Sequence, residues 1–298
     1  MMNILVTGSN GQLGNEIREL RKEFNHFNFI LTDVNELDIT NVPMLKQFFN
    51  NNKVNYIINC AAYTAVDKAE SDYKNADKIN VTAVSNLVKL AANYKIKFFH
   101  ISTDYVFDGA SKTPYTEISQ TNPKSVYGLT KLKGEIEASR YIQTVVFRTS
   151  WLYSSYGNNF VKTMLKLGSV REEINVVNDQ IGCPTYANDL ARVILNIIST
   201  VDEKNNCFKP GIYNYSNEGS CSWCDFAAEI MKLANLKCKV NPVETKEYPT
   251  PAKRPKYSVL NKNKIVETYN IEIPTWQDSL EKCINKINKQ LGYLKLTT

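Results

Sequence analysis

The chain has 298 residues, of which 43% are hydrophobic and 22% charged, and its 36 Lys and Arg residues exceed its 30 Asp and Glu residues by six. This composition is typical of a globular protein and excludes intrinsic disorder and a coiled coil. The positive charge is spread without a basic block or a nucleic-acid-binding motif, so we expect an anionic small molecule as a partner and no nucleic acid.

The sequence also indicates the compartment. No apolar run approaches the roughly 20 residues that span a bilayer, and the N-terminus lacks the basic segment of a signal peptide. We therefore expect a cytoplasmic protein without membrane contact. Seven cysteines, an odd number, favour free thiols; we interpret the Cys221–Cys224 pair as ordinary small buried residues, not as a zinc or redox site. The other cysteines are scattered singly at Cys60, Cys183, Cys207, Cys238 and Cys283.

The first half of the chain alternates short apolar runs with stretches of helical apolar spacing. Apolar runs between helical patterns are typical of strands buried on both faces, and their alternation with helices predicts right-handed crossovers in a doubly wound parallel sheet. The candidate strands are 3–7, 28–33, 55–59, 98–102 and 144–149.

A different texture begins at Trp151, where proline and glycine become frequent. We predict an α/β protein with a parallel-sheet domain at 1–150 and a smaller α/β substrate-binding lobe at 151–298, with segments near 172–215 returning to the first domain. Helical patterns in this half lie near 187–200, 222–235 and 276–290.

A glycine-rich loop follows the first candidate strand and opens the first helical pattern. It reads Gly8-Ser-Asn10-Gly11-Gln12-Leu13-Gly14. Glycines at such a turn allow the backbone to approach a pyrophosphate, which the helix N-terminus then binds through free N–H groups and its dipole. The loop therefore predicts a Rossmann-type dinucleotide-binding domain.

Asp33 lies at the end of the second candidate strand, 19 residues after Gly14. A carboxylate there can accept a hydrogen bond from the adenosine ribose 2′-hydroxyl, and it would repel a 2′-phosphate. Asp33 thus favours NAD over NADP. The glycine loop contains no Lys or Arg that would favour NADP. The sequence leaves NADH and NADPH open.

A proton-transfer pair is predicted at Tyr127 and Lys131. Of the 17 tyrosines, only Tyr127 has a lysine four residues further on, and residues i and i+4 share one face of a helix. The ammonium group would lower the phenol pKa from about 10 towards neutrality. Thr103, after the candidate strand 98–102, supplies a hydroxyl that could hydrogen-bond a reacting carbonyl oxygen.

These motifs together resemble the extended short-chain dehydrogenase/reductases, and within them the dTDP-4-dehydrorhamnose reductase family. The resemblance covers the chain from residue 3 to about 285. It implies that NADPH or NADH reduces the C4 keto group of dTDP-4-dehydro-L-rhamnose. The matching stretches are 8–14, 59–70, 102–109, 127–131, 148–151, 157–160, 178–185 and 254–261.

The resemblance also implies residue roles. Thr103, Tyr127 and Lys131 would form the catalytic triad. Besides Tyr127 and Lys131, the residues implied to bind the cofactor are Gly8, Asn10, Gly11, Gln12, Leu13, Gly14, Asp33, Asp38, Ile39, Ala61, Ala62 and Tyr63. Those implied to bind the substrate are Thr103, Asp104, Tyr105, Trp151, Asn159 and Arg254, the last as a clamp for pyrophosphate.

Two other functions share many of these features. A related sugar-nucleotide epimerase or dehydratase would use the same Tyr and Lys, but dehydratases usually carry an Asp-Glu pair after the Thr, where this chain has Asp104-Tyr105. A non-catalytic NADP-binding regulatory subunit would have no need of Tyr127 and Lys131. Some family members use Mg²⁺ and form homodimers. The sequence shows no carboxylate cluster that would fix a Mg²⁺ site, so no metal ligands are assigned, and it leaves Mg²⁺ use and a homodimer open.

Overall fold

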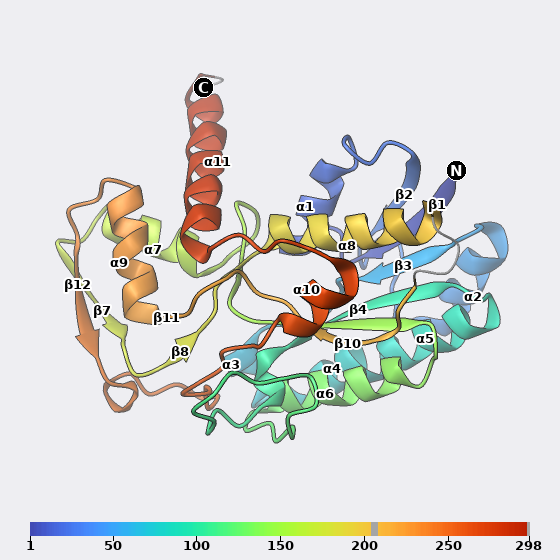
Figure 1. Ribbon diagram of the computed structural model, residues 1–298, viewed down its shortest axis with the longest axis horizontal. Coiled ribbons are helices and arrows are strands. Elements are labelled where there is room, and N and C mark those ends of the chain that lie inside the picture. Colours follow the sequence, from blue (N-terminus) through green and yellow to red (C-terminus); the bar gives the residue numbers. More distant parts are fainter. Residues whose placement is uncertain (204–207, 297–298) are drawn as a thin grey trace.

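The structure is a computed structural model that describes residues 1–203 and 208–296 (Figure 1). Its centre is a six-stranded sheet in the order β10-β5-β4-β3-β1-β2, in which all pairs are parallel. Cys207 lies outside the described residues. The strands are β1 (Met2–Thr7), β2 (Phe27–Thr32), β3 (Tyr56–Asn59), β4 (Lys97–Thr103), β5 (Thr144–Thr149) and β10 (Gly211–Asn214).

The predicted α/β fold with a doubly wound parallel sheet is confirmed, and all five candidate strands are present with ends shifted by at most one residue. The sequence analysis did not assign β10 as a strand. This strand has only four residues and lacks a long apolar run, so it gives a weak sequence signal. It joins the sheet edge through its pairing with β5.

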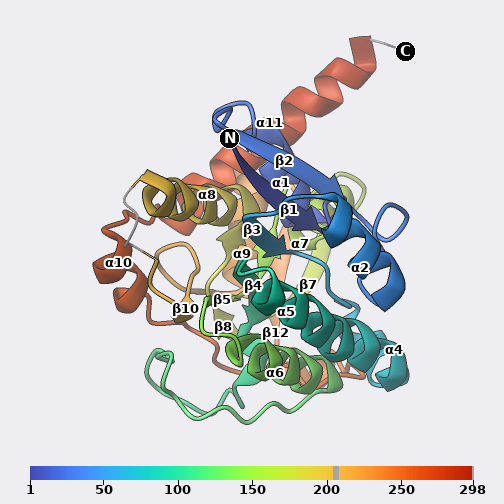
Figure 2. The ribbon, with the colours of Figure 1, turned by 90° about the vertical axis from the view of Figure 1, so that its right-hand side faces the viewer.

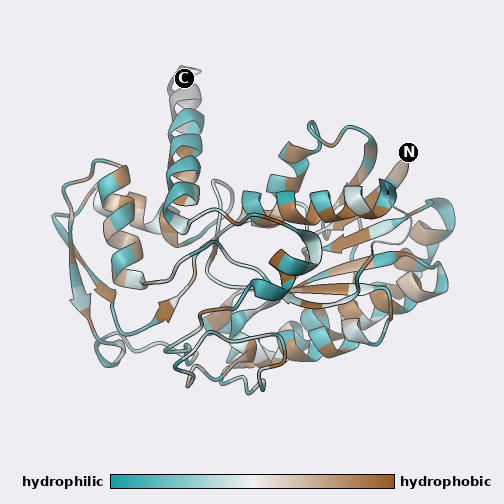
Figure 3. Ribbon diagram, viewed as in Figure 1, coloured by the Kyte–Doolittle hydropathy of each residue, from teal (hydrophilic) through white to brown (hydrophobic). Residues whose placement is uncertain are grey.

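Helices cover both faces of the sheet (Figure 2). Alternate side chains of one strand enter different cores: Ile4 and Val6 face α1 and α8, whereas Leu5 faces α2, α5 and α6. Figure 3 shows the matching alternation of hydrophobic and hydrophilic residues along these helices. The helices are α1 (Gln12–Leu20), α2 (Val42–Asn51), α5 (Ala83–Asn93), α6 (Val126–Ser139) and α8 (Ala187–Glu203).

Shorter elements connect the strand ends to these helices. Two helices and a π-helical turn lead into α5, and a 3-10 turn follows β4. They are α3 (Val66–Ala69), α4 (Tyr73–Asp77), η1 (Lys78–Thr82) and η2 (Asp104–Val106).

A second hydrophobic core lies beside the main sheet, built around α7, α9 and α11. Cys221 and Cys224 are buried free thiols within it. The helices predicted near 187–200, 222–235 and 276–290 are confirmed as α8, α9 and α11. The remaining elements are β6 (Leu152–Tyr153), α7 (Phe160–Gly168), β7 (Glu173–Val177), β8 (Ile181–Gly182), β9 (Thr185–Tyr186), β11 (Cys221–Ser222), α9 (Trp223–Leu233), β12 (Lys239–Val243), η3 (Thr245–Glu247), α10 (Asn263–Tyr269) and α11 (Trp276–Leu296).

The strand order creates a switch point beside β1. From β1 the chain passes to β2 on one side, and it then returns to β3 on the other side. Loops after neighbouring strands therefore diverge at the carboxyl ends of β1 and β3, which opens a crevice.

Candidate active site

A cavity of about 970 Å³ lies at the carboxyl ends of the strands. It brings together most of the residues that the sequence analysis named. Those that line it are Gly8, Asn10, Gly11, Gln12, Leu13, Gly14, Asp33, Asp38, Ile39, Ala61, Ala62, Thr103, Asp104, Tyr105, Tyr127, Lys131 and Trp151.

The glycine-rich loop has the shape that a dinucleotide pyrophosphate requires. Gly8 has a φ of +65°, and a Cβ there would lie 2.6 Å from the backbone nitrogen of Ala61. A Cβ on Gly14 would lie 2.5 Å from Cα of Ser9. No side chain caps the N-terminus of α1, and its first turn carries no acidic residue. The loop and helix end therefore present backbone N–H groups and a positive dipole to an anionic ligand.

Asp33, which the sequence analysis places beside the adenosine ribose, lines the cavity. Its Oδ2 accepts a hydrogen bond from the backbone N–H of Asn10 (2.9 Å), and its Oδ1 accepts one from that of Val34 (2.8 Å). Arg18, which the sequence analysis missed, donates to the side-chain oxygens of Ser9 (3.1 Å) and Asn10 (2.8 Å). The glycine-rich motif does not indicate Arg18, because this residue lies outside the loop, in the last turn of α1.

The tyrosine and the lysine lie on α6, which begins at its cap residue Ser125. Lys131 is 3% exposed, and its Nζ donates to the carbonyl oxygen of Ile101 (2.5 Å). Burial lowers the pKa of Lys131 to about 8, and the charge of Glu135 opposes this shift. Lys131 therefore keeps most of its positive charge at neutral pH.

The expected lowering of the pKa of Tyr127 by Lys131 is wrong for this arrangement. Burial raises the pKa of the Tyr127 phenol to about 12, although a hydrogen bond with Thr103 opposes the rise. The ammonium group of Lys131 is directed to the backbone of Ile101, and desolvation is the largest effect on the pKa of the phenol. Tyr127 is consequently protonated at neutral pH.

Thr103 and Asp104 form the end of β4 and the start of η2, and both are buried. The hydroxyl of Thr103 donates to Oδ1 of Asp104 (3.0 Å). Burial raises the pKa of Asp104 to about 6, with the hydrogen bond from Thr103 among the opposing effects. A group that changes charge near neutral pH thus adjoins the predicted catalytic hydroxyl.

A buried ion pair close to the three predicted catalytic residues was not predicted. Glu135 and Arg148 are 2% and 3% exposed; Arg148 donates to Oε2 of Glu135 from Nε (3.0 Å) and to Oε1 from Nη2 (2.5 Å). Ser102 donates to the same carboxylate (2.8 Å). The four-residue spacing of Tyr127, Lys131 and Glu135 along α6 could have indicated Glu135, but Arg148 comes from β5.

Two tryptophans form the opposite wall of the cavity. The rings of Trp151 and Trp223 stack with centroids 3.5 Å apart and an interplanar angle of 8°. Trp151 has a φ of 48°, in the left-handed region, and a Cβ on Gly182 would lie 2.5 Å from its ring. Trp151 is therefore confined between the backbone of Gly182 and the ring of Trp223, a residue that no sequence motif indicated.

Three predicted residues lie outside the lining of this cavity. The backbone N–H of Tyr63 donates to Asn80 (2.8 Å), and its hydroxyl donates to Oδ2 of Asp72 (3.0 Å). Asn159 caps α7, and its amide donates to Gln12 (3.0 Å) of the glycine-rich loop. Arg254 is paired with Asp67 (2.8 Å). Each of these side chains thus has a partner within the protein.

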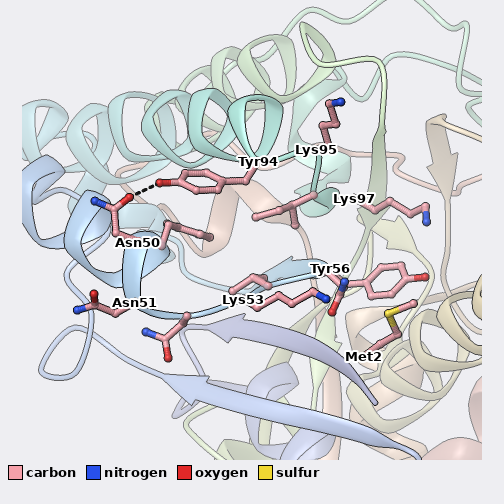
Figure 4. Close-up of a pocket in the computed structure, with 13 residues that line it drawn as sticks. Met2, Asn50, Asn51, Lys53, Tyr56, Tyr94, Lys95 and Lys97 are labelled. Carbon is pink, nitrogen blue, oxygen red and sulfur yellow. Dashed lines mark hydrogen bonds between the residues drawn. The ribbon is translucent and has the colours of Figure 1, made fainter.

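A second hollow of about 410 Å³ lies at the amino ends of β1, β3 and β4 (Figure 4). Lys53, Lys95 and Lys97 line it beside the carboxyl ends of α2 and α5. Lysine charges at helix carboxyl ends stabilise the helix dipoles. The predicted proton-transfer pair, Tyr127 and Lys131, lines the larger cavity and not this hollow.

Two absences hold for residues 1–203 and 208–296. Within these ranges no three His, Cys, Asp or Glu side chains are grouped so that they could hold a metal ion. None of the helices in these ranges combines the length and hydrophobicity needed to cross a lipid bilayer.

A parallel sheet with a glycine-rich loop after β1, a hydroxyl at the end of β4 and a Tyr–Lys pair on α6 defines an NAD(P)H-dependent oxidoreductase of the short-chain dehydrogenase/reductase type. The family model described as "RmlD substrate binding domain" matches residues 2–289. The chain belongs to this family, that of the dTDP-4-dehydrorhamnose reductases.

Relatives match over nearly their whole length. The dTDP-4-dehydrorhamnose reductase of Aggregatibacter actinomycetemcomitans is 39% identical over 288 residues, which cover 94% of this chain and 98% of the relative. A solved dTDP-4-dehydrorhamnose reductase from Clostridium acetobutylicum is 48% identical with a TM-score of 0.91, covering 96% of this chain and 100% of that one. One from Bacillus anthracis, solved in complex with NADP, is 39% identical with a TM-score of 0.88 and the same coverage.

Proposed function

We propose that this chain reduces the C4 keto group of dTDP-4-dehydro-L-rhamnose with NADPH or NADH and yields dTDP-L-rhamnose, the last step of dTDP-L-rhamnose synthesis. The family match over residues 2–289 carries the proposal. The presence of Thr103, Tyr127 and Lys131 in one cavity supports it, because a purely regulatory subunit would not need this group.

Tyr127 is the proton donor in this proposal. When bound, the reduced nicotinamide supplies the hydride that adds to C4. The Tyr127 hydroxyl gives its proton to the C4 oxygen, so the ketone becomes a hydroxyl and the phenol becomes a phenolate. Burial supports this direction because a phenol with a pKa of about 12 is protonated at neutral pH.

Thr103 and Lys131 assist the proton transfer. Thr103 would exchange its hydrogen bond to Asp104 for one donated to the keto oxygen, which it orients towards Tyr127. Lys131 binds the nicotinamide ribose, and its charge stabilises the phenolate formed when Tyr127 loses its proton. One of its three N–H donors is used by Ile101, which leaves donors for the ribose and for Tyr127.

The two parts of the chain divide the ligands in this proposal. Residues 1–150 hold the dinucleotide with the glycine-rich loop, Asp33, Asp38, Ile39 and 61–63. Residues 151–298 hold the sugar nucleotide with Trp151, Asn159 and Arg254, together with Thr103, Asp104 and Tyr105 from the first part. Arg254 would exchange its pairing with Asp67 for the substrate pyrophosphate, a geometry that guanidinium groups favour.

The test is oxidation of NADH or NADPH by purified protein in the presence of dTDP-4-dehydro-L-rhamnose. We expect the Tyr127→Phe substitution to lower kcat by at least about 100-fold, because it removes the general acid. The dissociation constants of both cofactors should change little. Tyr94→Phe, on the exposed side of the second hollow, is the matched control and should retain full activity.

The alternatives predict other results. Tightly bound NAD that copurifies with the protein, without net oxidation of added cofactor, would indicate an epimerase or dehydratase. Binding of cofactor without turnover would indicate a regulatory subunit. Either result would overturn the proposed reductase.

A further inference from the structure

The guanidinium of Arg18 lies against the glycine-rich loop. Its Nη2 donates to Oγ of Ser9 (3.1 Å) and to Oδ1 of Asn10 (2.8 Å). Helical side chains point back towards the helix N-terminus, so Arg18 reaches the loop from the last turn of α1. Two neutral oxygens are its partners.

Asn10 connects this cation to the predicted ribose site. Its backbone N–H donates to Asp33 Oδ2 (2.9 Å), while its side-chain oxygen accepts from Arg18 (2.8 Å). The side chain of Asn15 also donates to the carbonyl oxygen of Asn10 (2.7 Å). Asn10 and Asp33 both line the cavity. One ordered residue thus holds a carboxylate on one side and a guanidinium on the other.

Within residues 1–203 and 208–296, no carboxylate pairs with Arg18. Arg148, Arg192 and Arg254 each form an ion pair with an acidic side chain. Arg18 forms none of the ion pairs found in the described part of the chain. Its guanidinium therefore meets no opposite charge there and keeps unused N–H donors beside the loop.

The two charges have opposite effects on the adenosine ribose. Asp33 can accept a hydrogen bond from a free 2′-hydroxyl and repels a 2′-phosphate. A guanidinium beside the same loop residue offsets that repulsion, because its planar N–H donors bind phosphate oxygens.

We propose that Arg18 is the residue that lets this cavity accept the 2′-phosphate of NADPH beside Asp33. It does so by donating hydrogen bonds from its guanidinium to the phosphate oxygens. NADH, which lacks this phosphate, binds without using Arg18. This inference rests on the proposed function in one respect, namely that the cavity binds a nicotinamide dinucleotide.

The experiment measures the dissociation constants of NADPH and NADH from the intact protein by nicotinamide fluorescence, without sugar nucleotide. Arg18→Met should weaken NADPH binding by about 10- to 100-fold, the loss expected for a charge-assisted hydrogen bond to an ionised group. NADH binding should change by less than about twofold, and Arg18→Lys should lie between the parent and Arg18→Met. Arg21→Met is the matched control, because Arg21 is exposed just past the end of α1 and should leave both constants unchanged.

Further measurements separate the outcomes. Adenosine 2′-phosphate should compete with NADPH less well after Arg18→Met, whereas 5′-AMP should compete equally well in both proteins. An equal loss of NADPH and NADH binding would mean that Arg18 only supports the loop, and would overturn the proposal. Unchanged NADPH binding would also overturn it. Both of these results would leave the proposed function intact. If the parent protein binds neither NADPH nor NADH, the proposed function fails as well.

Discussion

The two walls of the cavity are held by different forces. The triad wall consists of Thr103, Tyr127 and Lys131, and the buried Glu135–Arg148 pair lies close to it. The aromatic wall consists of Trp151 and Trp223, with Gly182 behind it. Hydrogen bonds and charge orient the first wall, whereas close packing orients the second.

The comparison separates two ways to position a functional side chain. On the triad wall, a loss of charge leaves a buried partner uncompensated, which destabilises the fold. On the aromatic wall, an added methyl group displaces a ring without leaving any charge unpaired. Damage to the first wall should therefore appear in stability and pH dependence, and damage to the second mainly in substrate affinity.

Glu135→Gln should have the largest effect on stability. It leaves Arg148 as a buried charge without a counter-ion and should lower the free energy of unfolding by about 3–5 kcal/mol, measured by urea denaturation. Glu229→Gln, which removes an exposed pair with Lys232, is the control and should cost less than about 1 kcal/mol. The double variant Glu135→Leu/Arg148→Met should recover much of the loss, because neither charge remains. Equal losses in Glu135→Gln and the control would refute the role of charge on this wall.

Gly182→Ala should reduce substrate affinity. The new Cβ would lie 2.5 Å from the ring of Trp151, which cannot retreat because it stacks on Trp223. We expect the KM for the sugar nucleotide to rise about tenfold, with a stability loss of about 1–3 kcal/mol, while the dissociation constant of NADH stays constant. Adding Trp223→Leu should give the ring room and reverse part of the KM change. A parallel loss of NADH affinity would show that the aromatic wall is not specific to the sugar nucleotide.

The pH dependence should come from the triad wall. The pKa of Lys131 is about 8, so its positive charge is present below that pH and is lost above it. If the charged form assists Tyr127, kcat should fall about tenfold per pH unit above pH 8. NADH is the suitable cofactor here, because it lacks a 2′-phosphate that titrates. In Glu135→Gln this fall in kcat should begin at lower pH, because a neutral amide replaces the carboxylate that raises the pKa of Lys131. A flat kcat to about pH 10 would contradict this role of Lys131.

The predictions that succeeded rest on local features of the chain. Five strands were located because their apolar runs are bounded by turns and helical patterns, whereas β10 was missed because it is only four residues long. Tyr127 and Lys131 were expected on one helix face because they are four residues apart, and both line the cavity, while their catalytic role stays a prediction. Arg18 was overlooked because its contact with Asn10 depends on the direction of a long side chain, which residue spacing does not specify.

The sequence by itself determined the parallel sheet, the glycine-rich turn before α1 and the placement of Thr103 at a strand end, because these follow from backbone conformation and short-range periodicity. Only the tertiary structure decided which charges meet and how deeply they are buried. Arg148 meets Glu135, and Trp223 stacks on Trp151, although the residues of the second pair are 72 positions apart. The same holds for Tyr127, whose raised pKa results from burial. Desolvation depends on every atom packed around a group, and those atoms come from distant parts of the chain.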